Sequence, residues 1–339
     1  MKYIIIAVGL LYGFWIGVQK EVTKITGEET VQEVLDALGD APSPNLPNKL
    51  LPGASAEIGE SLVKFGKSQN LSGGNTMRQS RHFVCTSCHN VERESAYLNI
   101  EDPEERLAFT HEKGLPFVQG SPLFGIVNRT KFYNGDYEKK YGDLVDKARN
   151  NIREAIQLCA VECSQGRALK DWEIESILMY MWTIGLTMND LQWTEQELDL
   201  VDNALSDGKD RAAAISVIKS KYLDHAPATF GTPPSNYKEG MPDIEGNPVN
   251  GKIIYEDGCL HCHAKNEYSH YRLDNESLTF KQLANRMKYY DERSMYHVSR
   301  YGTKPKFGKR AYMPQYTEEK MSDQQLEDLR AYVLEQAER

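Results

Sequence analysis

The chain has 339 residues, of which 40% are hydrophobic and 26% charged, so it is long enough for two modest domains with cores of their own. Its formal net charge of −9 is opposite to the basic balance of proteins that bind nucleic acid, and we exclude that class of partner. The composition indicates a chain that is soluble over most of its length.

The first element is an apolar run from Tyr3 to Val18, which stops at Gln19 and Lys20. Its 16 residues lie between the core of a signal peptide and a full membrane span of about 20 residues. Bulky or polar residues follow where signal peptidase requires small ones, and no cysteine lies nearby to take a lipid. We therefore expect residues 1–20 to be an uncleaved, single-pass membrane anchor.

Residues 21–53 are expected to act as a tether between this anchor and the first globular domain. A short helical stretch, from Glu28 to Leu38, leads into a proline-rich segment over 40–53. Proline at this density prevents a continued helix, because each ring removes an N–H donor and fixes the backbone. The first domain is expected over 54–190, and it begins with a helix that includes Ile58.

Two copies of the motif Cys-x-x-Cys-His stand at Cys85–His89 and Cys259–His263. The spacing lets two thiols add across the two vinyl groups of one haem, while the adjacent imidazole reaches the iron. A single copy could also be a redox cysteine pair or half of a zinc site. Two copies predict two covalently bound haem c groups. The attachment residues are then Cys85, Cys88, Cys259 and Cys262, and the proximal iron ligands are His89 and His263.

The motifs also set the orientation of the anchor. Charge cannot, because Lys2 on one side is balanced by Lys20 and Lys24 on the other. Since haem is attached to c-type cytochromes outside the cytoplasmic membrane, we expect the domains to lie in the periplasm, or otherwise outside the cytoplasm. The anchor would then span the cytoplasmic (inner) membrane.

Two helices with one pattern predict two domains of one architecture. Apolar residues recur along one face of a helix from Ile174 to Trp182, behind an acidic start. The same pattern returns from Leu326 to Leu334, with Tyr180 and Tyr332 in register. Each helix is expected to pack across the first helix of its own domain.

A helical and then proline- and glycine-rich linker is expected over 191–246, and the second domain over 247–339. The first helix of that domain runs from Gly251 into the second motif. No segment shows the alternation of a β-strand. The predicted fold class is therefore all-α: two cytochrome c-like haem domains joined by a linker, with an N-terminal transmembrane anchor.

The distal ligand of the second haem is predicted to be Met313. It precedes Pro314 and stands nineteen residues before Tyr332, so that a rigid turn would hold its thioether against the iron. Met295 and Met321 are the alternatives, since methionine also serves as core packing.

The first domain has no Met-Pro pair, and the repeat supplies the candidates instead. Nineteen residues before Tyr180 lies Val161, between Cys159 and Cys163, the only cysteines outside the motifs. We take one of these two thiolates as the distal ligand. A disulfide between them is awkward at this helical spacing, and they could also be inert buried thiols. Other candidate ligands are Met179, Met181, Met188, His82 and His111.

Residues 59–182 resemble the N-terminal domain of thiosulfate dehydrogenase-type dihaem cytochromes. The shared features are a Gly-x-x-Leu helix, the Cys85–His89 motif, a cysteine seven residues before Gly166, and an acidic helix that ends at Trp182. The resemblance implies that this cysteine, Cys159, binds the haem iron and reacts with sulfur substrates. The extra thiol of Cys163 departs from the family pattern, and this concerns the substrate chemistry more than the haem ligation.

Unlike ligands predict unlike haems. A thiolate lowers the reduction potential and a His/Met pair raises it, so electrons would run from the first haem to the second. The favoured function is therefore an electron carrier between respiratory partners: a quinol-oxidising complex or dehydrogenase on one side, an oxidase or soluble cytochrome on the other. The alternative is an enzyme that interconverts thiosulfate and tetrathionate, with Cys159 as the reactive, catalytic thiol.

Overall fold

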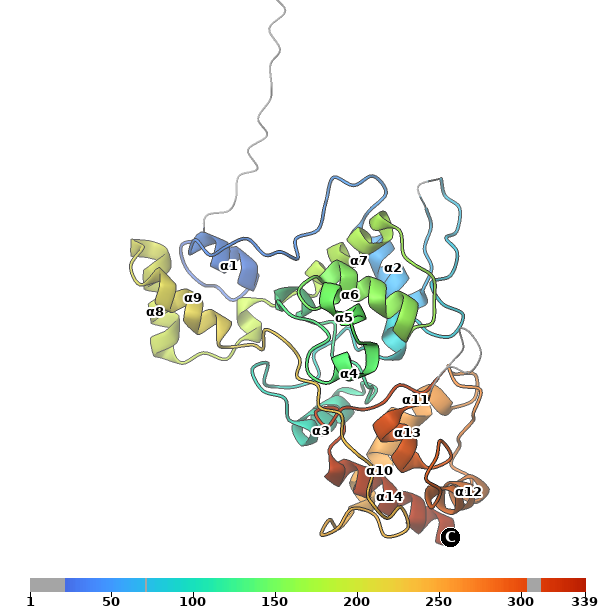
Figure 1. Ribbon diagram of the computed structural model, residues 1–339. Coiled ribbons are helices and arrows are strands. Elements are labelled where there is room, and N and C mark those ends of the chain that lie inside the picture. The colour runs from blue at the N-terminus through green and yellow to red at the C-terminus, as the bar shows by residue number, and fades with distance from the viewer. Residues whose placement is uncertain (1–21, 71, 304–311) are drawn as a thin grey trace, which may run out of the picture.

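The computed structural model describes residues 22–70, 72–303 and 312–339, and all regular elements in these ranges are helical (Figure 1). The all-α prediction is confirmed for this part of the chain. The predicted anchor over residues 1–20 lies outside it. Within the described ranges, no helix has the length and apolar character that crossing a membrane requires.

The first group of helices surrounds the first Cys-x-x-Cys-His motif and shares one apolar core. The core is formed mainly by side chains of the helices at 152–158 and 171–183 and of the first helix, among them Leu62, Ile152 and Ile177. The elements are α2 (Ala56–Phe65), η1 (Cys85–Ser87), η2 (Ile126–Asn128), α4 (Tyr137–Tyr141), α5 (Leu144–Ala148), α6 (Ile152–Leu158), the π-helix η3 (Cys159–Cys163) and α7 (Asp171–Thr183).

The second group of helices surrounds the second motif and has a core of its own, rich in aromatic side chains such as Tyr255, Phe280 and Tyr332. Its last helix begins with a capping box, in which Ser322 and Gln325 satisfy each other's backbone N–H groups. The elements are α10 (Pro248–Ile253), the π-helix η5 (Ile254–Cys259), α11 (Leu260–His263), α12 (Ser277–Met287), α13 (Met295–Tyr301) and α14 (Asp323–Glu338).

The predicted helix pairs cross in the same way in both groups. Helix α2 packs against α7, and α10 packs against α14 (Figure 1). At each crossing the first helix has a glycine, Gly59 or Gly251, where a Cβ would stand 2.9 or 2.8 Å from the Cβ of Tyr180 or Tyr332. The glycines are required because the helix axes come too close for any side chain. Tyr180 and Tyr332, which the sequence pattern aligns, therefore occupy equivalent positions at the two helix crossings.

Each crossing also carries one matching polar contact. The helix N-cap residue donates its backbone N–H to a side chain of the last helix: Ser55 to Ser176 Oγ at 3.2 Å, and Asn247 to Asp328 Oδ1 at 2.7 Å. A Cβ on either crossing glycine would overlap the carbonyl oxygen of the same acceptor residue. The two helix pairs thus make the same contacts at equivalent positions, although the residue types differ.

Part of the segment expected as a tether is packed against the helical part of the linker. Helix α1 (Val31–Ala37) buries Val31 and Val34 in a third apolar cluster with α8 (Glu195–Asp207), α9 (Arg211–Lys219) and η4 (Met188–Asp190). The apolar residues of α1 recur at helical spacing, so this face needs a partner, and the α8–α9 hairpin supplies it. The proline-rich stretch that follows is also held down, since Asn45 donates to the carbonyls of Val127 and Arg129.

Helix α3 (Pro103–Lys113), which the sequence analysis did not predict, joins the two groups (Figure 1). Leu107 and Phe117 belong to the apolar core of the second group, although they precede it by more than 100 residues. The backbone N–H of Phe117 donates to the carbonyl of Asp257 at 3.0 Å. This contact brings the two motifs close together.

Candidate functional site

The first motif lies in a short 3-10 helix whose geometry orients the histidine. The backbone N–H of His89 donates to the carbonyl of Cys85, and its ring Nδ1 lies 2.6 Å from the carbonyl oxygen of Ser121. Since a carbonyl only accepts, Nδ1 carries the proton and Nε2 is left with its lone pair. This tautomer is the one that an iron ligand needs.

A glycine allows the loop after α3 to cover this histidine. The N–H of Gly120 donates to the carbonyl of Cys88 at 2.8 Å, and a Cβ there would overlap the imidazole of His89. The close approach therefore requires glycine, and the backbone at Gly120 packs against the imidazole ring of His89.

The second motif follows a π-helical turn and ends in α11. The ring Nδ1 of His263 lies 2.6 Å from the carbonyl oxygen of Tyr271, so this imidazole also keeps Nε2 free. Both predicted proximal histidines thus have the same tautomer and the same kind of carbonyl partner.

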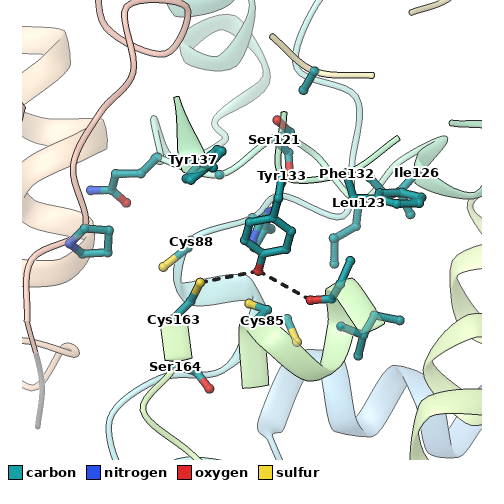
Figure 2. A pocket seen from close by; sticks show the side chains of 18 of the residues that line it. Cys85, Cys88, Ser121, Leu123, Ile126, Phe132, Tyr133, Tyr137, Cys163 and Ser164 are labelled. Atoms are coloured by element: carbon teal, nitrogen blue, oxygen red, sulfur yellow. Dashed lines mark hydrogen bonds between the residues drawn. The ribbon is translucent and has the colours of Figure 1, made fainter. Parts of the chain in front are cut away.

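The first cavity, of about 230 Å³, contains the first motif together with both remaining cysteines. Cys85, Cys88 and Cys163 converge there with Tyr133 (Figure 2). All six cysteines are free thiols, so the disulfide considered for Cys159 and Cys163 is absent. Met181 also lines the cavity. The other candidate ligands do not: Met179, Met188, His82 and His111.

Cys163 lies among phenol groups. Its Sγ is 3.2 Å from the hydroxyl of Tyr141 and 3.5 Å from that of Tyr133, and Figure 2 shows the second contact. A hydrogen bond from Cys159 lowers the pKa of Cys163 to about 6; burial opposes this, and the two hydroxyls and Lys140 add to the lowering. The same bond raises the pKa of Cys159. The pair can therefore hold one thiolate, stabilised by several donors.

The phenol groups were not predicted as part of the site. Tyr133, Tyr137 and Tyr141 line the first cavity and pack ring against ring, with centroids 5.5 to 6.2 Å apart. Their spacing of four residues is the signal that could have found them, because it places side chains on one face of a helical segment.

The second cavity, of about 550 Å³, contains the second motif and Met313. Met313 is held by two hydrogen bonds with Thr303: its N–H donates to the hydroxyl at 2.8 Å, and its carbonyl accepts from the backbone N–H at 2.9 Å. The alternatives, Met295 and Met321, line the same cavity. The carbonyl of Met321 accepts a hydrogen bond from the buried Arg300. The side chain of Met321 is 1% exposed and belongs to the apolar core of the second group.

The two cavities share a wall. Phe83, Gln119, Tyr312 and Pro314 line both of them. The rings of Phe83 and Tyr312 meet edge to face with centroids 6.0 Å apart. Across the same boundary, Cys262 Sγ lies 4.0 Å from the carbonyl oxygen of Ser87. The two motifs therefore face neighbouring cavities rather than distant ones.

Polar atoms inside these cavities fit a haem. Buried oxygens of Gln79 and Gln119 have no hydrogen-bond partner within the described residues, nor has the hydroxyl of Thr317. The first cavity is otherwise lined largely by apolar side chains, such as Phe132 and Ile177. A flat apolar ring with carboxylates at one edge matches the apolar lining and the hydroxyl of Thr317, which can donate to a carboxylate; the amide oxygens of Gln79 and Gln119 only accept and are not satisfied by it.

Residues 248–337 match the family model for cytochrome c. The match includes the second motif and Met313, so this part of the chain is a cytochrome c domain and is expected to bind haem c covalently and to transfer electrons. No curated protein and no solved structure matches the chain.

Proposed function

We propose that the chain is a dihaem cytochrome c, anchored in the cytoplasmic membrane, that transfers electrons between respiratory-chain partners in the periplasm. One observation carries the proposal: each Cys-x-x-Cys-His motif faces a cavity that also contains a separate sulfur donor, and the two cavities share a wall. The equivalent crossings of α2 with α7 and of α10 with α14 support a second haem domain beside the one that matches a known family.

The ligands that we propose are His89 and Cys159 for the first haem, and His263 and Met313 for the second. Bound haem would supply one-electron redox chemistry, at a low potential with thiolate and at a higher potential with thioether. We choose Cys159 because it stands seven residues before Gly166, as in the family that the first domain resembles. The bond between the two cysteines lowers the pKa of Cys163 and raises that of Cys159. Iron bound at Cys159 would therefore have to move the thiolate charge to Cys159 and leave the proton on Cys163, which lies beside Tyr133 and Tyr141.

The location and the partners rest on the sequence. The apolar run over residues 3–18 supports the anchor, and covalent haem supports an extracytoplasmic site. A quinol-oxidising complex or a dehydrogenase would deliver electrons, and an oxidase or a soluble cytochrome would accept them. The net charge of −9 favours partners with a basic docking surface.

A second candidate function is supported by the thiol of Cys159 and the ammonium group of Lys140, which line the same cavity. Two thiosulfate ions can join through a sulfur–sulfur bond to form tetrathionate, which releases two electrons, one for each haem. Cys159 would be the reactive thiol of this reaction, and Lys140, which also lines the cavity, would favour an anionic substrate.

The experiment that tests the proposed function combines a spectroelectrochemical titration with electron paramagnetic resonance of the oxidised protein. We expect two components of unequal potential, one with thiolate and one with thioether ligation. Cys159→Ser should abolish the thiolate signal, whereas the matched variant Cys163→Ser should keep it. Two components of equal, high potential in the wild type would contradict the proposal.

A steady-state assay with thiosulfate separates the two candidate functions. If the chain is a carrier, wild type and Cys159→Ala should both lack activity above background. Turnover by the wild type that Cys159→Ala abolishes would establish the enzyme instead.

A further inference from the structure

A group of buried charges lies where the two halves of the chain meet, next to the first cavity. Arg106 on α3 forms an ion pair with Glu94 at 2.7 Å, and both side chains are almost fully buried. Lys320, from the segment before α14, forms an ion pair with Glu101 at 3.1 Å, and its side chain is 4% exposed. Arg106 also donates to the carbonyl of Lys320 at 3.0 Å, which ties the two pairs together.

This group has more cations than anions. Arg129 joins it electrostatically, since Glu101 and Glu94 both act on its guanidinium. Three cations thus face two carboxylates, and Arg129 has no ion-pair partner within the described residues. Burial lowers the pKa of Lys320, Glu101 opposes this, and Arg106 and Arg129 add to the lowering. The excess positive charge is costly in a buried setting unless an anion neutralises it.

The unpaired donors of the group line the first cavity. Lys320, Arg129 and Thr317 all line it, although two of them belong to the second half of the chain. Lys320 uses one of its three N–H donors on Glu101, and the hydroxyl of Thr317, which is 2% exposed, has no hydrogen-bond partner within the described residues. Ammonium, guanidinium and hydroxyl groups together form a site for a carboxylate.

We infer that Lys320 and Thr317 of the second domain, together with Arg129 of the first, bind the propionate carboxylates of the haem at Cys85 and Cys88. The inference rests on the proposed function, because it requires a haem at the first motif. The same cavity holds the attachment thiols and His89, and the propionates are the anionic groups of a haem. The second domain therefore completes the binding site of the first haem, so the first domain is not an independent unit.

The variant Lys320→Met tests this in the purified holoprotein. A cation near a haem favours the reduced state, which carries one more negative charge. Its removal should lower the reduced-to-oxidised ratio of the first haem about tenfold at a fixed potential, equivalent to about 59 mV for one electron. The ratio for the second haem should change less than about threefold. Lys320→Arg keeps the positive charge, so it should keep the reduced-to-oxidised ratio of the first haem close to that of the wild type.

The control is Lys281→Met, which removes the same charge from the exposed face of α12 in the same domain. It should leave the ratio of either haem within about twofold of the wild type. The inference is overturned if Lys320→Met and Lys281→Met behave alike, or if the second haem shifts more than the first. Intact mass measured first keeps the two proposals apart: a missing first haem contradicts the proposed function, and a present but unshifted one contradicts only this inference.

A second variant serves if Lys320→Met fails to fold. Thr317→Val replaces the hydroxyl by a methyl group of similar size, so it removes the hydrogen-bond donor without changing the charge. The bending bands of the propionates in the resonance Raman spectrum report their hydrogen bonds directly. We expect Thr317→Val to shift the bands of the first haem and to leave its covalent attachment intact, whereas unchanged bands would refute the site.

Discussion

At the scale of single residues, the two cavities differ in the sulfur atoms that they contain. Cys159 and Cys163 share one cavity with phenol donors, and Met313 lies in the other, held through its backbone by Thr303. Thiolate and thioether are unlike donors, so the same histidine geometry can support two different potentials. In the function that we propose, these residues would set the direction of electron flow.

Substitution of Met313 tests its assignment. Met313→Ala removes the thioether, so the second haem should become harder to reduce, with a reduced-to-oxidised ratio at least about tenfold lower at a fixed potential, or about 59 mV. Met295→Ala is the matched control in the same cavity and should shift the ratio less than about threefold. A spectroelectrochemical titration measures both, and a larger shift in the control would reassign the ligand.

The candidate site was predictable from the sequence where spacing alone determines chemistry. Cys85–His89 and Cys259–His263 are local patterns, and Met313 was placed by its distance from Tyr332. The rest depends on contacts that no local pattern records. Arg106 meets Lys320 across 214 residues, and Phe83 meets Tyr312 across the wall between the cavities.

At the scale of helices, the repeat rests on two close crossings. The pairs α2 with α7 and α10 with α14 were predictable, because α7 and α14 share one apolar pattern at helical spacing, and side chains cap α2 and α14. Helix α3 was missed because it is rich in charge, and its apolar Leu107 is covered by a core that forms more than 100 residues later.

Addition of one methyl group should disrupt a crossing. Gly251→Ala places a Cβ against the carbonyl of Asp328, where the helix backbones cannot separate without loss of packing. We expect the free energy of unfolding to fall by about 1–3 kcal/mol or more, measured by chemical denaturation. Gly74→Ala, where the nearest atom would lie at 3.5 Å, should change it by less than about 0.5 kcal/mol. Equal effects would mean that the crossing tolerates a side chain.

At the scale of the whole molecule, the two halves form one unit through α3. Leu107 of α3 and Phe117 in the loop after it reach the second core, and the charge group around Arg106 reaches the first cavity. The neighbouring cavities depend on this arrangement. A pair of domains joined only by a flexible linker would not hold the two cavities at a fixed separation.

The buried pair of Glu94 and Arg106 makes the stability of the fold depend on pH. Burial raises the pKa of Glu94, but Arg106 and Lys320 lower it further, so the folded value lies below the unfolded one. Its stabilising contribution is therefore complete above the ordinary glutamate pKa of about 4.3 and is lost as the pH falls through the folded pKa.

Glu94→Gln should leave Arg106 without its counter-charge and lower the free energy of unfolding by about 3–5 kcal/mol near neutral pH. The loss should shrink below a pH of about 4.3, where the carboxyl of the unfolded wild-type chain begins to take up a proton, and should vanish as the pH falls through the lower folded pKa. Denaturation curves at several pH values measure this. Glu112→Gln on the exposed side of α3 should have an effect below about 0.5 kcal/mol, and a loss for Glu94→Gln that is independent of pH would contradict the assignment.

The central claim is that both motifs hold a covalent haem. Mass spectrometry of the intact mature protein, produced in cells that mature c-type cytochromes, tests it most directly. We predict the mass of the polypeptide plus two haem groups, with one haem lost in Cys85→Ala/Cys88→Ala and the other lost in Cys259→Ala/Cys262→Ala. A wild-type mass with one haem, or with none, would contradict the account.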